Sequence, residues 1–498
     1  MVIIMQINLE ISPMEKMINI KDRLECFFDG RLIDRNNTTA EYRLHQPVRR
    51  ETVITHDEPW EGPMSCYHVI IPDGDKYRMY YRGQRGINLG NVICYAESRD
   101  GINWVKPELG VCEFNGSKKN NIIIDKTIHP YIDNFFVFKD ENPACPPDRI
   151  FKAVGMYNIP AEDDLDPKYG LRLYYSEDGI HFKNGGLLLD NKTGAFDSMN
   201  VIFWDKEYGK YRCYFRGSHP APEGTPSSAS GNAIRDVRYT ESVDFKNWSA
   251  PIILGDPEHM DIPLYTNNIQ SYYREPHTYV GFPTRYIERI TWGDSFDELC
   301  GKTERQERMK KFEARTALTV TECGFMASSD GVNFRTYDES WCPPLPEDGT
   351  NWLYGDRYFA YGMIEMPSTI KGADPEISMY CIEHYWIDPA VDLVRYTIRL
   401  DGFVSLHADG NEKTILTKVF TYDGDELFVN FATSAWGYMY FTLIDENGNH
   451  YQSEEHFGNS THRRIKIADD AVKRLSGKPV RLEVRLRDAD LYSIQFGK

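Results

Sequence analysis

The chain has 498 residues, more than one ordinary core accommodates, and its length predicts about two or three domains. Hydrophobic residues make up 41% and charged residues 27%, as in soluble globular proteins, which excludes an extensively disordered chain. The formal net charge of −18 argues against a nucleic-acid partner, because such binding depends on clustered Lys and Arg, and it favours neutral or cationic ligands.

The first residues, 1–10, have no basic region, no long apolar stretch and no small-residue cleavage site, so we expect a cytoplasmic protein. No apolar run approaches the roughly 20 residues that a membrane span requires, so no membrane partner is expected. The 10 cysteines form no Cys-x-x-Cys pair and are expected to be reduced, mostly buried thiols. Metal-binding spacings of His or Asp are also missing from the sequence, so we predict no metal and no cofactor.

One phrase occurs four times along the chain: a strand end, a Ser, an Asp, a turn and an aromatic residue. In each copy Ser and Asp can bond to the turn backbone, and the aromatic residue begins the next strand, which is typical of a hairpin. The copies are roughly 65 to 85 residues apart, and the runs between them have strand composition. They lie at Tyr95–Trp104, Tyr174–Phe182, Tyr239–Trp248 and Met326–Phe334.

Repeats of this length, with about four strands each, fit propeller blades better than solenoid coils, whose repeats are shorter. A fifth unit is expected at 358–365 and 377–383, where the composition favours strands but the phrase is missing. We therefore predict an all-β fold with a five-bladed β-propeller over residues 51–388. The segment Ser295–Thr316 has Glu and Lys or Arg at helical spacing and is expected to be a solvated helical excursion in the fourth blade.

The composition changes after residue 388, where strands alternate with turns and the phrase does not recur. Residues 389–498 are predicted to form a separate C-terminal β-sandwich. Residues 1–50 are expected to be an N-terminal segment that packs on the propeller. The sequence leaves the oligomeric state open.

Carboxylates precede the candidate inner strands of the first three blades. The innermost strands of a propeller line its axial funnel, so Asp57 or Glu61, Asp133 and Asp197 are expected to converge there. Asp133 and Asp197 stand in similar sequence contexts, which suggests equivalent funnel positions. Glu275 is a further candidate acid in the fourth blade. Because glycosidic cleavage typically needs two carboxyl groups, these residues are the catalytic candidates.

Arginines form a second constellation. Arg82 and Arg216 end the second strands of their blades in matching Arg-Gly contexts, and Arg285 follows Gly-Phe-Pro-Thr in the fourth blade. A guanidinium can orient a carboxylate or donate a fork of bonds to sugar hydroxyls, so these arginines are candidate substrate-binding residues. The remaining expected substrate-binding residues are Trp60, Asn200, His277 and Glu365.

The stretch 98–121 resembles the five-bladed glycoside hydrolases related to families 32 and 43, while Phe196–Trp204 and Arg399–Ser405 are similar to uncharacterised bacterial members. The resemblance covers most of the chain and implies a trio of carboxylates on the inner strands. It assigns the nucleophile or base to Asp57 or Glu61, the auxiliary role to Asp133 or Asp197, and the general acid to Asp197 or Glu275. The family 32 motifs Asn-Asp-Pro-Asn-Gly, Arg-Asp-Pro and Glu-Cys-Pro do not occur in the sequence, so these alternatives stay open.

These observations together predict a glycoside hydrolase that acts on an oligosaccharide or another glycoside. One alternative is a five-bladed phosphorylase, in which Arg82, Arg216 and Arg285 would hold phosphate in place of water. The other is a carbohydrate-binding propeller without turnover, in which the carboxylates only bind hydroxyls.

Overall fold

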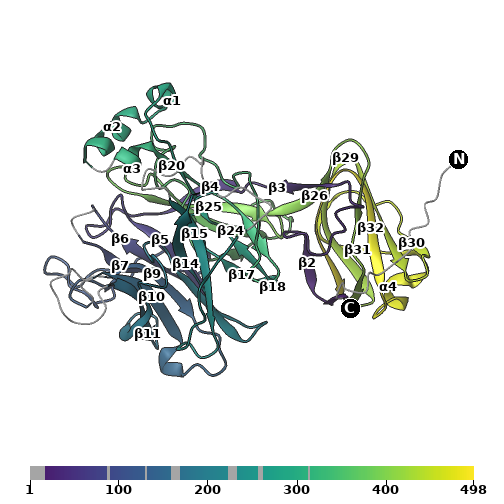
Figure 1. Cartoon of the computed structure of the whole chain (residues 1–498), viewed down its shortest axis with the longest axis horizontal. Helices are drawn as coiled ribbons and strands as arrows, with labels where there is room; N and C mark the ends of the chain where they lie inside the picture. Colours follow the sequence, from purple (N-terminus) through teal and green to yellow (C-terminus); the bar gives the residue numbers. More distant parts are fainter. Residues whose placement is uncertain are drawn as a thin grey trace.

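The computed structural model describes residues 17–86, 90–128, 132–158, 169–221, 233–255, 262–311 and 314–497. Five four-stranded antiparallel sheets form a propeller, and a ten-stranded sheet stands beside it (Figure 1). The predicted all-β, five-bladed fold is confirmed. Within the described ranges, no helix is long and apolar enough to cross a membrane.

Each blade runs from an inner strand to an outer one, and the strands are consecutive except at two places. Blade one is β5 (Cys66–Asp73), β6 (Lys76–Gly83), β7 (Val92–Ser98) and β8 (Ile122–Ile124); blade two is β9 (Ile132–Lys139), β10 (Phe151–Asn158), β11 (Tyr169–Ser176) and β12 (Lys183–Asp190). Blade three is β13 (Val201–Asp205), β14 (Lys210–Pro220), β15 (Ala233–Ser242) and β16 (Ile252–Ile253); blade four is β17 (Gln270–Tyr272), β18 (Glu275–Gly281), β21 (Met326–Ser328) and β22 (Arg335–Thr336).

Blade five combines two distant parts of the chain. Its inner three strands are β23 (Ile364–Met366), β24 (Glu376–Glu383) and β25 (Asp392–Arg399), and its outer strand is β4 (Val48–Thr55). The expected fifth unit is therefore present. Strand β25, which the sequence analysis placed in the C-terminal domain, belongs to the propeller, and its pairing with β4 closes the ring.

The repeated phrase joins neighbouring blades as well as turning the chain. In the first copy, Ser98 Oγ accepts from the Gly101 amide at 2.9 Å, and Asp100 Oδ1 accepts from two further turn amides. The Gly carbonyl then accepts a tyrosine hydroxyl from the preceding blade: Tyr80 donates to Gly179 at 3.0 Å, Tyr214 to Gly331 at 2.8 Å, and Tyr380 to Gly101 at 2.6 Å. These contacts connect blade one to two, three to four, and five to one.

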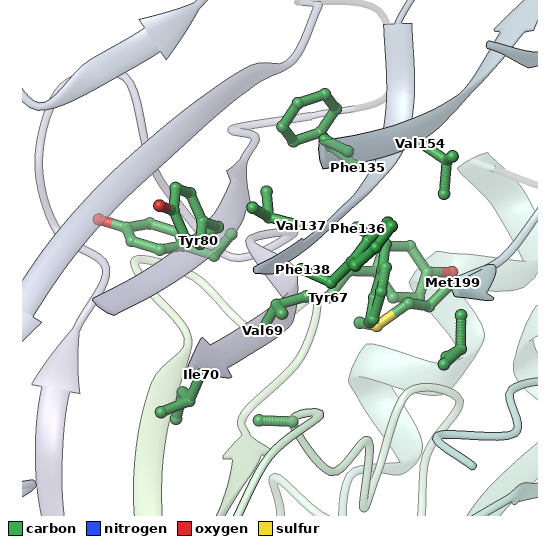
Figure 2. Close-up of a cluster of buried hydrophobic side chains, with 14 of the residues drawn as sticks. Tyr67, Val69, Ile70, Tyr80, Phe135, Phe136, Val137, Phe138, Val154 and Met199 are labelled. Atoms are coloured by element: carbon green, nitrogen blue, oxygen red, sulfur yellow. The ribbon is translucent and has the colours of Figure 1, made fainter. Parts of the chain in front are cut away.

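The propeller core lies between the inner strands of adjacent blades. Figure 2 shows Val69 and Ile70 of β5 in one cluster with Phe136 of β9 and with Met199, which precedes β13. All four side chains are almost completely buried, because a propeller blade packs on both of its faces. Continuous apolar runs such as Phe135–Phe138 are the sequence signature of this arrangement.

The ten-stranded sheet takes strands from both ends of the chain. From the N-terminal part come β1 (Ile18–Lys21), β2 (Leu24–Cys26) and β3 (Glu41–Leu44), and from the C-terminal part β26 (Val404–Ala408), β27 (Lys413–Leu416), β28 (Phe420–Tyr422), β29 (Glu426–Asp445), β30 (His450–Gln452), β31 (Asn459–Ile465) and β32 (Val480–Gly497), with the short helix α4 (Ala471–Arg474). The long strands β29 and β32 pair along most of their length and hold the others together. The C-terminal region is thus one continuous hydrogen-bonded sheet with its own apolar core, and the expected two-sheet sandwich stays a prediction.

The N-terminal strands therefore complete this ten-stranded sheet, while residues beside β2 also reach the propeller. Phe28 packs edge-on against Tyr272 and Phe325 of the fourth blade.

The expected helical insert lies between β19 (Thr284–Glu288) and β20 (Thr319–Cys323), which pair as a separate two-stranded ribbon. Its helices are α1 (Asp294–Glu298), α2 (Lys302–Lys311) and α3 (Ala314–Leu318). Figure 1 shows them above the blades.

Candidate active site

A cavity of about 540 Å³ opens among the blades and the helical insert. Its wall takes residues from blades one, three and five, from the residues that precede blade four, from the ribbon strand β19 and from helix α3. This is the convergence expected of a propeller funnel. The lining residues are Met64, Tyr67, Arg82, Gln84, Asp197, Arg216, Arg235, Tyr265, Tyr286, Arg315, Thr316, Tyr354, Tyr385 and Trp386.

Two of the predicted arginines occupy equivalent places in this wall. Inner-strand residues Val69 and Val201 pair with tyrosines of β6 and β14, and Arg82 and Arg216 each lie two residues beyond those tyrosines. Arg82 donates to Asp133 Oδ1 at 3.0 Å, and Arg216 Nη2 lies 3.3 Å from Asp197 Oδ2. Each guanidinium therefore holds one of the predicted carboxylates.

The two carboxylates are not equivalent, although the sequence contexts suggested it. Asp133 belongs to β9 and is held by an arginine of the preceding blade, whereas Asp197 precedes β13 and is held by an arginine of its own blade. The Asp133 side chain is 27% exposed and the Asp197 side chain 55%. The Asn134 side chain is oriented with its amide nitrogen toward Asp133 Oδ1, at 3.2 Å, and its oxygen accepts from the Ser198 amide at 3.1 Å. One side chain therefore links the starts of strands β9 and β13.

Local structure explains why Asp197 reaches the cavity. It is exposed, while its neighbours Phe196 and Ser198 are buried. The Asn200 amide donates to the carbonyls of Phe196 and Ser198, at 2.9 Å each. Asn200 is fully buried, so it positions the turn that presents Asp197 rather than touching a ligand.

Aromatic side chains form much of the wall. Arg82 stacks over Tyr67 with 4.9 Å to the ring centroid, and Arg216 over Tyr265 with 5.3 Å. Tyr385 and Trp386 stack on each other with 5.9 Å between centroids. Burial raises the pKa of the Tyr67 and Tyr265 phenols well above the usual value, so both are neutral hydroxyls at physiological pH.

The helical insert is a structural part of the cavity, not a solvated excursion. Buried Arg305 donates to the Ala317 and Trp352 carbonyls at 3.0 and 2.6 Å. Arg308, also buried, donates to the carbonyl of Tyr385 at 2.9 Å. The exposed face of α2 has the charge pattern that predicted solvation, but buried Arg305 fixes the helix to Ala317 and Trp352, and buried Arg308 fixes it to the segment that carries Tyr385.

Glu61 lies in a sealed network and cannot reach a ligand in the cavity. It is fully buried, accepts from the Tyr81 hydroxyl at 2.5 Å and pairs with Lys106 at 2.6 Å. Burial by itself raises the pKa of Glu61, but the neighbouring His56 and Lys106 outweigh burial and bring it to about 2.

Its neighbours in the sequence also lie outside the cavity lining. The Asp57 side chain is 71% exposed and 3.8 Å from Lys106. The Trp60 indole donates to Asn121 at 2.8 Å and packs edge-on against Phe114.

Glu275 and His277 lie where the propeller meets the ten-stranded sheet. His277 Nε2 is 3.0 Å from Glu275 and 3.4 Å from Glu25 of β2, and Glu25 also pairs with Arg31. The Cys26 amide donates to Glu275 at 3.0 Å. Among the described residues, Glu25, Glu275 and His277 are a buried group whose ligand atoms, within 4.8 Å of one another, could hold a metal ion. The cationic side chains of Arg31 and His277 already balance the carboxylates of Glu25 and Glu275, so we interpret the group as an ion-pair network.

Arg285 does not follow the other two arginines. In blade one, Tyr77 pairs with Ser98 of the phrase, and Arg82 is the fifth residue after Tyr77. In blade four, Tyr279 pairs with Ser328, and the fifth residue after Tyr279 is Thr284, not Arg285. Arg285 is one position further on, and side chains alternate along a strand. Its guanidinium accordingly pairs with Glu322 at 3.3 Å and is not part of the lining.

Glu365 of β23 also lies away from the cavity. It accepts from the Tyr273 hydroxyl at 2.9 Å and is 3.5 Å from Arg274, which pairs in turn with buried Asp401. Of the predicted residues, Arg82, Asp197 and Arg216 thus line the cavity, and Asp133, which is not part of the lining, pairs with Arg82.

Most of the wall was not predicted. Arg235, on the third strand of its blade, and the loop residues Tyr354 and Tyr385 carry no motif. The repeated phrase could have located Arg235. Its third copy marks the end of β15, and because side chains alternate along a strand, that end determines which β15 residues share a face. The contribution of α3 had no comparable signal.

No protein-family model matches the chain. Over 169 residues it is 28% identical to an uncharacterised protein of Mycobacterium tuberculosis (strain ATCC 25618 / H37Rv), a match that covers 33% of this chain and 46% of that protein. The chain thus spans about half the length of the curated relatives it matches.

The chain is similar to solved structures at low sequence identity. One, titled glycoside hydrolase, is 13% identical with a TM-score of 0.42, over 71% of this chain and 92% of that one. The Bombyx mori GH32 beta-fructofuranosidase is 11% identical with a TM-score of 0.38, over 91% and 94% of the two chains. The assignment of five blades rests on the sheets of this chain itself.

Proposed function

We propose that the protein is a glycoside hydrolase that uses Asp197, which lines the funnel cavity, and Asp133, which is held by the lining residue Arg82. The observation that carries this proposal is the pairing of two carboxylates with two register-equivalent arginines, Arg82 and Arg216, at an aromatic wall. Glycosidic cleavage needs one carboxyl group to protonate the leaving oxygen and another to assist water or attack the sugar. Tyrosine and tryptophan rings offer the flat apolar faces on which sugar rings stack.

The difference in side-chain exposure between Asp197 and Asp133 distinguishes their catalytic roles. Asp197 is the more exposed carboxylate and lines the cavity, so we assign it the proton transfer at the glycosidic oxygen. Asp133 is oriented by Arg82 and Asn134, and we assign it the second role, with water or with the anomeric carbon. Glu61 and Glu275, the other candidates for these roles, are buried in networks of their own.

The test is a panel of aryl glycosides and oligosaccharides, assayed with the wild type and with Asp197→Asn. We expect the substitution to lower kcat/KM by about 100-fold or more, the usual contribution of a general acid, while ligand binding is retained. The control Asp57→Asn removes an exposed carboxylate outside the lining and should leave kcat/KM unchanged. If no glycoside is cleaved while one binds tightly, the protein is a binding propeller and the proposal is wrong.

The arginines favour one second candidate, phosphorolysis. A guanidinium fork suits phosphate as well as carboxylate, and Arg82 and Arg216 both line the cavity, although Arg285 does not. In that case cleavage would depend on added phosphate and would release a sugar 1-phosphate, whereas hydrolysis proceeds in a phosphate-free buffer.

A further inference from the structure

The charge of the cavity lining is opposite to that of the chain. The formal net charge of the chain is −18, yet among the residues that the structure describes the lining includes four arginines and one carboxylate, Asp197. The sequence-based preference for neutral or cationic ligands therefore does not describe this site. Asp197 and Asp133 are already in ion pairs with Arg216 and Arg82, and Arg235 adds a further cationic side chain to the wall.

Arg235 is the side chain that points to a ligand. It lies on β15, and its guanidinium stacks on Tyr286 with 4.1 Å to the ring centroid. Its Nη1 is buried and has no hydrogen-bond partner in the part of the chain that the structure describes. A buried donor without an acceptor costs free energy, and an oxyanion in the cavity would remove that cost.

The balance of hydrogen-bond donors and acceptors in the wall also favours an anionic ligand. Arginine side chains only donate, whereas sugar hydroxyls both donate and accept. In the described part of the wall, Arg82 and Arg216 are paired with carboxylates and the Arg235 guanidinium keeps a donor without an acceptor, so the wall matches a ligand with an excess of acceptors better than it matches a neutral sugar. The volume of about 540 Å³ and the rings of Tyr67 and Tyr265 leave room for a sugar ring beside the charged group.

We propose that the cavity recognises a hexuronate unit, and that the ring carboxylate of this unit binds to Arg235. The proposal rests on the proposed function in that it takes the ligand to be a carbohydrate. Inorganic phosphate offers the same oxyanion chemistry, so the experiment includes it as a separate arm.

The test is isothermal titration of the full chain with the methyl glycosides of glucuronic and galacturonic acid, their neutral glucose and galactose counterparts, and inorganic phosphate. We expect at least one uronate to bind about tenfold or more tightly than its neutral counterpart, as one charge-assisted hydrogen bond permits. Equal or tighter binding of the neutral sugars overturns the proposal, and so does the failure of both uronates to bind. Phosphate that binds and raises the cleavage of neutral glycosides also overturns it, in favour of phosphorolysis.

Two variants locate the carboxylate. Arg235→Gln should lose the preference for the uronate, while Arg238→Gln, on the same strand but bonded to Asp236 at 3.1 Å and outside the lining, should keep it. If Arg235→Gln does not fold, Arg235→Lys retains the charge but not the fork and should reduce the preference. Because titration does not depend on turnover, uronate binding without cleavage would contradict only the proposed hydrolysis, and cleavage of neutral glycosides alone would contradict only the uronate.

Discussion

Arg82 on the second strand of blade one donates to Asp133 on the inner strand of blade two, with 3.0 Å between Nη1 and Oδ1. The other guanidinium nitrogen, Nη2, contacts Cys66 Sγ at 3.0 Å and the Tyr385 hydroxyl at 3.1 Å. One side chain therefore connects blades one and two with the β24–β25 loop of blade five. It supports the ring closure of the propeller as well as the candidate site.

We expect Arg82→Ala to lower the free energy of unfolding by about 3 kcal/mol. Arg82 is only 8% exposed, and removal of one partner from a buried ion pair leaves the other charge uncompensated. The matched control is Arg99→Ala, because the Arg99 side chain is 83% exposed in its pair with Asp75 and its loss should change stability by less than about 0.5 kcal/mol. Urea unfolding of both variants measures the difference, and equal stabilities would show that the Arg82 pair contributes nothing to the fold.

Glu61 should make the protein sensitive to acid. Its pKa is about 2 in the folded chain and near 4.5 when unfolded, so its contribution is complete above pH 4.5 and is lost as the pH falls toward 2. A shift of this size corresponds to about 3 kcal/mol.

Glu61→Gln should therefore be less stable than the wild type at neutral pH and should approach it as the pH falls from 4.5. Chemical unfolding at a series of pH values measures this. Asp57→Asn changes an exposed carboxylate nearby and should follow the wild-type profile. A difference in the free energy of unfolding between Glu61→Gln and the wild type that stays constant across that range would contradict the low pKa of Glu61.

His277 should act in the alkaline range. Burial lowers its pKa, but the carboxylates of Glu25 and Glu275 outweigh burial and raise it to about 9. The unfolded value is near 6.5, so the stabilisation is complete below pH 6.5 and disappears as the pH rises to about 9. Burial together with the charge of Glu25 also raises the pKa of Glu275, which adds a loss of the same sign above pH 4.5.

The wild type should accordingly lose about 3 kcal/mol between pH 6.5 and 9, while His277→Gln should lose much less over the same range. Denaturant unfolding in this range, with the exposed His450→Gln as the control, tests the expectation. Parallel pH profiles of His277→Gln and the wild type would show that His277 is neutral in the folded protein.

A glycine of the repeated phrase, Gly179, and a glycine of the β13–β14 turn, Gly209, offer a comparison at similar backbone geometry. Gly179 and Gly209 both have positive φ, +76° and +62°, so an Ala at either position is strained by about 1 to 2 kcal/mol. A Cβ at Gly209 would meet no atom within 4 Å, whereas at Gly179 it would lie 2.7 Å from the Tyr80 hydroxyl.

Gly179→Ala should therefore lower the melting temperature more than Gly209→Ala does, because it also separates blades one and two. Thermal unfolding followed by circular dichroism compares them. Similar losses in the two variants would mean that the Tyr80 contact is not important for blade packing.

The same contacts explain how far the sequence could predict the fold. Ser, Asp and Gly define a local turn, so the hairpins, and through their spacing the blades, could be found from the sequence alone. The third copy has Phe245 where the others have Gly, and the preceding blade has Val154 where blades one and three have tyrosines. Gly and Tyr thus occur together because the hydroxyl approaches the turn, a relation between blades that no local pattern expresses.

The candidate site was predictable only in part, for a related reason. Asp197 and Arg216 follow from strand order and from the Arg-Gly context, which are local signals. Glu275 likewise begins a strand of a blade, β18, but β2 from the N-terminal part covers it, and the sequence gives no indication of that distant contact. Burial by a remote segment is what separates Glu275 from the carboxylate that lines the cavity.

Arg308 should control the wall of the cavity without supporting the propeller as a whole. Burial lowers its pKa to about 10, and its guanidinium donates to the Tyr385 carbonyl at 2.9 Å and stacks over Trp386 with 5.4 Å to the ring centroid. Arg308→Ala leaves that buried carbonyl without its donor, a local cost of about 1 to 3 kcal/mol. Tyr385 and Trp386 both line the cavity, so we expect weaker ligand binding, by about tenfold, and faster hydrogen exchange in α2 and around Tyr385. Lys310→Ala, on the exposed side of the same helix, should change neither quantity. The ring of blades closes through β4 and β25 and not through the insert, so the free energy of global unfolding of Arg308→Ala should differ little from that of the wild type. A large loss of global stability would instead show that the helices hold the propeller ring together.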